Sequence, residues 1–294
     1  MELTSLLLMA ESGADRRAAL LRALLFVILA FVSALIITEI LKRVARVTFA
    51  DLGGASISLQ IAAKFGLLTA FVLLPTIALL LMFREPLERF GWSGAATGRG
   101  IGLGALTGIL AFLATIAGIA LLSRATASLN PASASTIMTQ FALSLLVWIA
   151  GALIEEATFR GYLLIQVARA WSFWPAALLS SLVFALIHVD RSANPLLTGL
   201  SVGLVGLILC YSVRIFGSIW FAVAFHMSWN FLQSFAFGVN NSGKPPPAFL
   251  SSWSFEGPAW ITGGQVGPEG SIVAVAVLAV TFLAVVFVLP RSLP

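Results

Sequence analysis

Long, nearly uninterrupted apolar stretches are the feature that most limits how this chain can fold. An α-helix needs roughly 20 mostly apolar residues to cross a bilayer, and stretches of about that size recur along the whole sequence. The fourth is interrupted by charged residues, and the fifth is short enough to be partly re-entrant. The sequence therefore predicts an all-α fold, a polytopic membrane helix bundle with about eight transmembrane helices, near residues 20–41, 61–83, 101–122, 138–167, 173–189, 194–213, 216–237 and 271–289.

The shortage of charged side chains leads to the same interpretation. Hydrophobic residues make up 60% of the 294 positions and charged residues only 10%, whereas a soluble domain carries about 25% charged residues. Lipid must therefore cover most of the exterior, which predicts an integral, multi-pass membrane protein (in the plasma membrane if the source is bacterial). The net charge is +5, but the basic residues stand mainly beside the apolar stretches. That placement favours contact with membrane lipids and argues against nucleic acid as a partner.

The chain is expected to form one structural domain with three consecutive parts. Residues 1–136 would supply the first three helices, beginning with an apolar stretch that lacks signal-peptide features before it and is predicted to be retained as a signal-anchor. Residues 137–237 would form the core, helices 4–7. Residues 238–294 would supply a loop rich in proline and glycine, at 238–270, and the last helix. That loop is predicted to be irregular, either a lid or rim over a cavity or a plain tether.

Three glycines recur at intervals of four residues, at Gly100, Gly104 and Gly108. This spacing places them along one face of a helix. In a membrane, small residues on one face let the backbone of a neighbouring helix approach closely. We therefore predict that this face packs against another helix.

Ionisable side chains inside the apolar stretches are the strongest functional signal, because they are costly in lipid and usually functional there. Glu155 and Glu156 stand together inside the fourth stretch. The two histidines of the chain, His188 and His226, also fall within predicted spans. An isolated intramembrane histidine is more often a packing residue with a hydrogen bond. Two histidines with a glutamate pair and Asn230 make coincidence a poor explanation.

Helical spacing assigns different surroundings to the two glutamates. Glu156 and Arg160 are four residues apart, so they share a face and can form an ion pair, which would partly offset the cost of burying both. Such a pair on one helix is often only a structural contact. Glu155 points about 100° away, with Phe159 and Tyr162 near its face, and is left to move protons.

The second pair of polar side chains lies further along the chain. His226 and Asn230 are also four residues apart. They therefore share a helix face and can direct hydrogen-bond donors at one point.

Together the motifs resemble those of a known family. Glu-Glu-x-x-x-Arg at 155–160, Phe-x-x-x-His at 184–188 and His-x-x-x-Asn at 226–230 resemble, in order, those of the type II CAAX prenyl endopeptidases and their bacterial relatives, the CPBP (formerly Abi) group. The resemblance covers about residues 137–237. It implies an intramembrane endopeptidase with a polar chamber between helices, in which Glu155 deprotonates a water that attacks the scissile carbonyl.

The resemblance also implies roles for the other motif residues. His188 would aid Glu155, His226 and Asn230 would donate hydrogen bonds to the developing oxyanion, and Glu156 and Arg160 would support the site. A metal-dependent mechanism stays open, because Glu155, His188 and His226 offer ligands suited to zinc. The chain has no His-Glu-x-x-His motif, so the alternative is a mechanism that uses no cofactor. The substrate would be a peptide or lipid-modified protein, and the family name implies cleavage after a prenylated C-terminal cysteine.

Two other functions, and one other proteolytic mechanism, compete with glutamate-dependent proteolysis. A catalytically silent membrane protein could serve bacteriocin immunity or scaffolding by binding a peptide or partner protein. Glutamate and histidine chains also occur in transporters and proton relays. The sequence Gly-Leu-Ser-Val-Gly at 199–203 matches a serine hydrolase pattern, with Ser201 and His226 as a remote candidate pair. That pattern requires a strand-to-helix turn, and here a membrane helix is predicted.

Overall fold

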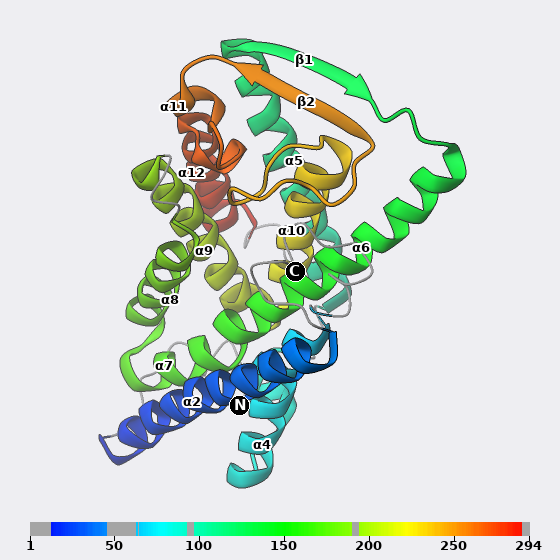
Figure 1. Ribbon diagram of the computed structural model, residues 1–294. Helices are drawn as coiled ribbons and strands as arrows, with labels where there is room; N and C mark the ends of the chain where they lie inside the picture. The colour runs from blue at the N-terminus through cyan, green and yellow to red at the C-terminus, as the bar shows by residue number, and fades with distance from the viewer. Residues whose placement is uncertain (1–12, 46–62, 64, 93–96, 190–193, 290–294) are drawn as a thin grey trace.

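The computed structural model describes residues 13–45, 63, 65–92, 97–189 and 194–289. Helices occupy the described part of every apolar stretch predicted to be helical, which confirms the all-α membrane bundle (Figure 1). The α-helices have the bounds α2 Gly13–Ala45, α4 Leu74–Phe83, α5 Thr97–Leu122, α6 Ala134–Glu156, α7 Leu164–Trp171, α8 Phe173–His188, α9 Pro195–Phe216, α10 Trp220–Phe231, α11 Ala259–Thr262 and α12 Ile272–Phe287. Shorter π- and 3-10 segments are η2 Thr69–Leu73, η3 Leu87–Phe90, η4 Ala157–Leu163, η5 Leu232–Ala236 and η6 Pro268–Gly270.

Not every predicted helix is long enough to cross a bilayer. Within the described residues, 5 helical segments have the length and hydropathy of a membrane span: Asp15–Ile40, Phe65–Phe83, Thr97–Leu122, Ala134–Trp171 and Pro195–Phe216. The apolar helices α8 and α12 have 16 residues each, or about 24 Å of rise at about 1.5 Å per residue. That is shorter than a hydrocarbon core of about 30 Å. The five long segments and the shorter apolar helices together form the polytopic helix bundle that the sequence predicted.

Local sequence explains where several helices begin and end. The hydroxyl of Ser133 accepts a hydrogen bond from the amide of Thr136 at the start of α6, and Ser271 accepts one from Ala274 at the start of α12. Both are the side-chain caps that unpaired amides at a helix start favour. Gly217 ends α9 with a φ of 60°, a left-handed conformation that glycine adopts without a steric penalty. Local sequence therefore defines one end of each of the helices α6, α9 and α12.

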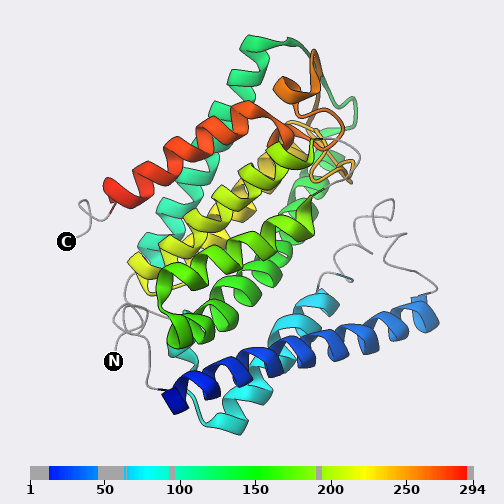
Figure 2. The ribbon, with the colours of Figure 1, turned by 90° about the vertical axis from the view of Figure 1, so that its left-hand side faces the viewer.

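The helices form two layers of unequal size. Helix α2 packs against α4 and α7, and in Figure 2 α2 and α4 lie below the remaining helices as a separate layer. In the larger layer α10 packs against α5 and α6, while α9 packs against α8 and α12. Large apolar side chains on the outer faces are exposed, for example Phe31, Leu81, Leu121 and Leu186, as expected of surfaces that face lipid.

The glycine face of α5 lies directly against α10. A Cβ atom added at Gly104 would be 2.9 Å from the backbone C and Cα atoms of Phe221 and closer still to its carbonyl oxygen. One added at Gly108 would be 3.1 Å from the same two atoms of Phe225, and again closer to the carbonyl oxygen. The predicted helix packing is confirmed, and it fixes the depth of α10, which carries His226 and Asn230.

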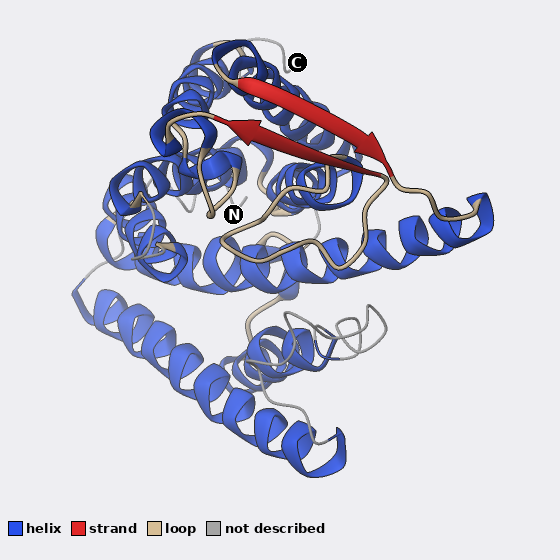
Figure 3. Cartoon of the chain, turned by 45° about the horizontal axis from the view of Figure 1, so that its top comes forward, coloured by secondary structure: helices blue, strands red, loops and turns tan. Residues whose placement is uncertain are grey.

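A two-stranded antiparallel ribbon crosses one end of the bundle (Figure 3). Its strands are β1 Arg124–Leu129 and β2 Ser251–Glu256, with Arg124 opposite Glu256 and Leu129 opposite Ser251. The second strand lies inside the segment 238–270, which the sequence predicted to be irregular throughout, so that prediction was wrong for β2. The local alternation in β2 is short, and its dense proline and glycine surroundings concealed it.

Candidate active site

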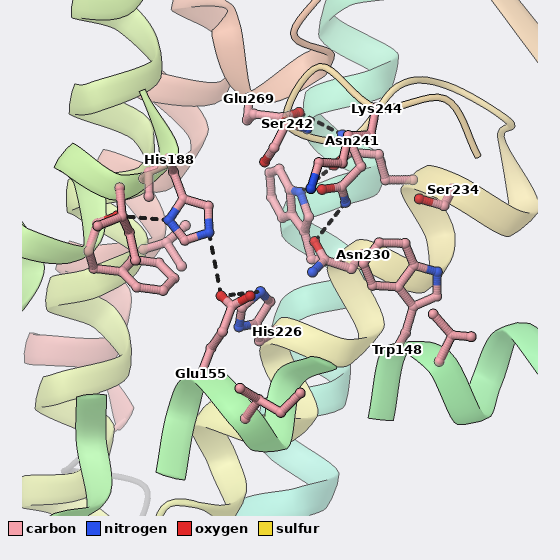
Figure 4. A pocket seen from close by; sticks show the side chains of 18 of the residues that line it. Trp148, Glu155, His188, His226, Asn230, Ser234, Asn241, Ser242, Lys244 and Glu269 are labelled. Carbon is pink, nitrogen blue, oxygen red and sulfur yellow. Dashed lines mark hydrogen bonds and ion pairs between the residues drawn. The ribbon is translucent and has the colours of Figure 1, made fainter. Parts of the chain in front are cut away.

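Three helices bring the predicted catalytic side chains to one cavity. Glu155 is the penultimate residue of α6, His188 is the last residue of α8, and His226 and Asn230 lie on α10. All four line one cavity of about 1270 Å³, and Figure 4 shows them arranged around it. The predicted convergence of the four side chains is therefore present in the structure.

Glu155 is the residue on which the two histidines meet. Its Oε2 atom lies 3.4 Å from Nε2 of His188 and 3.8 Å from Nε2 of His226. The Glu155 side chain keeps 32% of its surface exposed, and it lines the cavity. The carboxylate therefore lies between two imidazoles and is accessible from the cavity.

Glu156 holds His226 from the opposite side. Glu156 Oε1 is 2.7 Å from Nδ1 of His226, and Glu156 Oε2 is 3.1 Å from Nη1 of Arg160. The side chains of Glu156 and Arg160 are both fully buried. A carboxylate paired with arginine accepts hydrogen bonds, so Nδ1 of His226 donates to Glu156 and Nε2 is the atom turned toward Glu155. Sequence spacing predicted the Glu156–Arg160 pair but could not show the contact with His226.

The phenylalanine four residues before His188 has two structural roles. Nδ1 of His188 lies 2.8 Å from the carbonyl oxygen of Phe184. A carbonyl can only accept, so Nδ1 carries the hydrogen and Nε2 faces Glu155. The guanidinium carbon of Arg160 lies 4.2 Å from the centre of the Phe184 ring, a cation–π contact. Phe184 thus fixes the orientation of one imidazole and covers the buried cation.

A π-helical turn directly after the glutamate pair alters which residues share a face. The turn η4 spans Ala157–Leu163, and π-helical turns often occur at functional sites. Phe159 lines the cavity with Glu155. Tyr162 instead stacks between Phe26 and Phe90, at centroid distances of 5.0 Å and 4.6 Å. The expectation that Tyr162 lies near the face of Glu155 was wrong, because the wider turn rotates the later residues.

The segment after α10 contributes polar residues that sequence analysis did not identify. Asn241, Ser242, Lys244 and Glu269 line the same cavity, and Nδ2 of Asn241 donates to Oδ1 of Asn230 at 2.9 Å. This segment therefore forms a rim of the cavity, which confirms the lid or rim interpretation over the plain tether. No spacing signal marked these residues, because they lie in a stretch without regular periodicity.

The donor atoms suit zinc in chemistry but not in present arrangement. Glu155, His188 and His226 supply the oxygen and nitrogen ligands that zinc accepts, and both imidazoles have the second nitrogen engaged, as metal-bound histidines do. In the part of the chain that the structure describes, however, no group of three or more His, Cys, Asp or Glu side chains is gathered closely enough to hold a metal ion.

Ser201 has the contacts of a packing residue. It lies inside α9, and its hydroxyl donates to the carbonyl oxygens of Thr198 at 3.1 Å and Glu269 at 2.5 Å. Among the described residues no hydrogen bond joins it to His226. A nucleophilic serine needs a base in contact and a strand-to-helix turn. The arrangement does not support a serine hydrolase.

Comparison with known proteins identifies the segment that carries this site. Residues 137–232 match the family model described as Type II CAAX prenyl endopeptidase Rce1-like. No curated protein matches the chain. The matched segment contains Glu155, His188, His226 and Asn230, together with the helices that position them.

The family match and the fold support the same conclusion. The matched family is one of membrane peptidases, and the span-length apolar helices are those of an integral, multi-pass membrane protein. Residues 137–232 therefore carry a domain of the type II CAAX prenyl endopeptidase Rce1-like family.

Proposed function

We propose that this chain is an intramembrane endopeptidase in which Glu155 activates the water that cleaves a peptide bond. The observation that carries the proposal is the position of the Glu155 carboxylate, 3.4 Å and 3.8 Å from two imidazole nitrogens on a large cavity. Three separate helices supply these groups. Burying them together near lipid is costly without a function.

The geometry supports a sequence of proton transfers. The Glu155 carboxylate takes a proton from water, and the hydroxide adds to the scissile carbonyl carbon. His188 lies beside Glu155 and holds that carboxylate in place. The oxyanion accepts hydrogen bonds from Nε2–H of His226 in its charged form and from Nδ2–H of Asn230. As the C–N bond breaks, Glu155 returns its proton to the leaving amine.

The lining of the cavity fits a peptide carried by an apolar group. Its rim is polar, whereas Leu67, Phe71, Val147 and Ile154 form an apolar part of its wall. A peptide bond could therefore reach Glu155 while an attached lipid or membrane segment stays in apolar surroundings. This supports a lipid-modified or membrane-embedded substrate, in agreement with the prenylated peptides that the family name implies.

A comparison of purified variants tests the proposal. Wild-type protein, Glu155→Ala and Glu256→Ala are incubated in detergent with a library of prenylated and unmodified peptides, and products are identified by mass spectrometry. Glu256 is an exposed acid on β2 outside the cavity, so its variant is the matched control. Wild type and Glu256→Ala should cleave, and Glu155→Ala should lose at least about 1,000-fold in rate.

Two further results would change the assignment. Cleavage that is abolished by a strong chelator and restored by zinc would replace the glutamate mechanism with a metal-dependent one. Full cleavage by Glu155→Ala would refute the role of Glu155. If the wild type cleaves nothing while Glu155→Ala keeps its biological function, a binding role such as bacteriocin immunity or scaffolding would be favoured.

A further inference from the structure

The amide group of Asn230 has a defined orientation in the cavity. Its Oδ1 atom accepts a hydrogen bond from Nδ2 of Asn241 at 2.9 Å. Figure 4 shows this bond on the side of Asn230 that faces Asn241. Among the described residues Nδ2 of Asn230 has no hydrogen-bond partner, and Asn230 lines the cavity. The donor end of this amide is therefore left for a ligand in the cavity.

The orientation matters because the two ends of an amide have opposite roles. Nδ2 carries two hydrogens and donates, whereas Oδ1 only accepts. An oxyanion is stabilised by the first and repelled by the second. Rotating the Asn230 amide by half a turn would therefore convert a favourable contact into an unfavourable one without moving the backbone.

The residues on both sides of Asn241, Asn240 and Ser242, are held by a hub of hydrogen bonds around Gln233 and Glu269. Oε1 of Glu269 accepts from the amide of Ser242 at 2.5 Å, and Oε2 of Glu269 accepts from Nε2 of Gln233 at 2.6 Å. The same Gln233 nitrogen donates to the carbonyl oxygen of Asn240 at 2.6 Å. Gln233 and Glu269 are 0% and 7% exposed, so water does not replace these bonds readily.

The hub also ties the turn to the helix that carries the site. Gln233 comes three residues after Asn230, in the π-helical segment η5 that follows α10, and its Oε1 atom accepts from the indole nitrogen of Trp229 at 2.8 Å. The amide of Gly243 donates to the carbonyl oxygen of Val266 at 2.9 Å and closes the other side of the turn. The position of Asn241 is thus fixed relative to Asn230 by contacts on both sides.

We propose that Asn241, held by Gln233 and Glu269, is a positioning residue that keeps the donor end of Asn230 turned toward the oxyanion. This inference rests on the proposed function, in which Asn230 donates to that oxyanion. In this proposal the three positioning residues line the cavity but take no direct part in the reaction. They act through the orientation of one amide.

Substitution of Asn241 by aspartate tests the orientation of the Asn230 amide while nearly preserving the shape of the side chain at position 241. Aspartate has nearly the same shape, but its carboxylate only accepts. The Asn230 amide then rotates to donate to it, which turns Oδ1 toward the oxyanion. Loss of one oxyanion donor costs about 100- to 1,000-fold in kcat, so Asn241→Asp should lose about that much at nearly unchanged KM.

Leucine at the same position removes the tether without forcing the amide to rotate. Asn241→Leu should therefore lose clearly less activity than Asn241→Asp, by at least about fivefold in kcat. A purely structural role predicts the reverse order, because aspartate preserves the shape better. Gln265→Glu adds a negative charge on an exposed residue of the same segment that does not line the cavity, and should keep kcat near that of the wild type.

Two controls make each failure distinguishable. Asn230→Ala with wild-type kcat would refute the donor role of Asn230, and the inference with it, while the role of Glu155 is judged by its own variant. An inactive Asn230→Ala beside a fully active Asn241→Asp would refute the inference alone. Glu269→Gln serves as a second test in case Asn241→Asp does not fold. It leaves an amide NH₂ facing one of the two donors and should lower kcat at unchanged KM. A wild-type kcat in Glu269→Gln would also overturn the proposal.

Discussion

Replacing Gly104 by alanine tests whether the contact between α5 and α10 sets the position of the site. A Cβ at this position would lie 2.9 Å from the backbone C and Cα atoms of Phe221 and closer still to its carbonyl oxygen. To restore an ordinary C···O separation of about 3.3 Å, α10 must move away from α5 by about 1 Å. Backbone atoms cannot rotate away as a side chain can, so the whole helix has to shift.

The expected magnitude has a stability part and an activity part. Overpacking of this kind costs about 1–3 kcal/mol in unfolding free energy. His226 lies five residues after Phe221 on the same helix, and a displacement of about 1 Å in a catalytic group costs about 100-fold in rate. Gly104→Ala should therefore lose about 100-fold in peptide cleavage while it still folds.

Gly102→Ala is the matched control, because a Cβ there meets nothing within 4 Å. Both variants are purified in the same detergent, and thermal unfolding is followed by circular dichroism beside the cleavage assay. Gly102→Ala should behave as the wild type in both measurements. If the two alanine variants have the same unfolding midpoint and the same rate, the close approach of α5 and α10 does not position His226, and the reasoning is refuted.

Two further predictions concern buried ionisable groups. Arg160→Ala leaves the fully buried Glu156 without its cation and should lower the unfolding free energy by about 3–5 kcal/mol. The control Arg43→Ala, in an exposed pair, should leave the unfolding free energy almost unchanged. Equal unfolding midpoints for the two variants would contradict this prediction. Burial raises the pKa of Glu269, outside the spans, to about 7, so the folded state binds its proton more tightly than the unfolded state does. The unfolding free energy should then fall as pH rises from about 4.5 to about 7, by on the order of 3 kcal/mol. Glu269→Gln should flatten this part of the profile of unfolding free energy against pH. An unchanged profile in the variant would show that Glu269 does not titrate there.

The sequence predicted the fold class and the polar side chains that meet at the cavity because both depend on local patterns. Apolar length identifies helices, and costly polar residues inside them indicate a site. The spacing of Glu156 and Arg160 on one helix was enough to predict their ion pair. Gly104 and Gly108 predicted a close contact, although not that α10 would be the partner.

The parts that were missed depend on contacts between distant segments. The bond between His226 and Glu156 joins residues 70 positions apart, and that between Gln233 and Glu269 joins residues 36 apart. No periodicity marks Glu269 or Asn241, because they lie in irregular chain whose conformation is set by tertiary hydrogen bonds. The wide turn η4 was missed for a related reason, since a π-helical turn has the same composition as the α-helix around it.

The order of the ionisable side chains at the site explains why their burial near lipid is tolerated. Arg160, Glu156, His226, Glu155 and His188 form a continuous series, with successive separations of 3.1, 2.7, 3.8 and 3.4 Å. The fully buried end of the series is an ion pair, and the accessible end is Glu155 at the cavity. A buried charge is strongly destabilising only when its partner is missing, so the inner pair lowers the cost of holding His226 in place. The outer carboxylate, between two imidazoles and next to the cavity, is the member of the series that accepts the proton of water in the proposed mechanism.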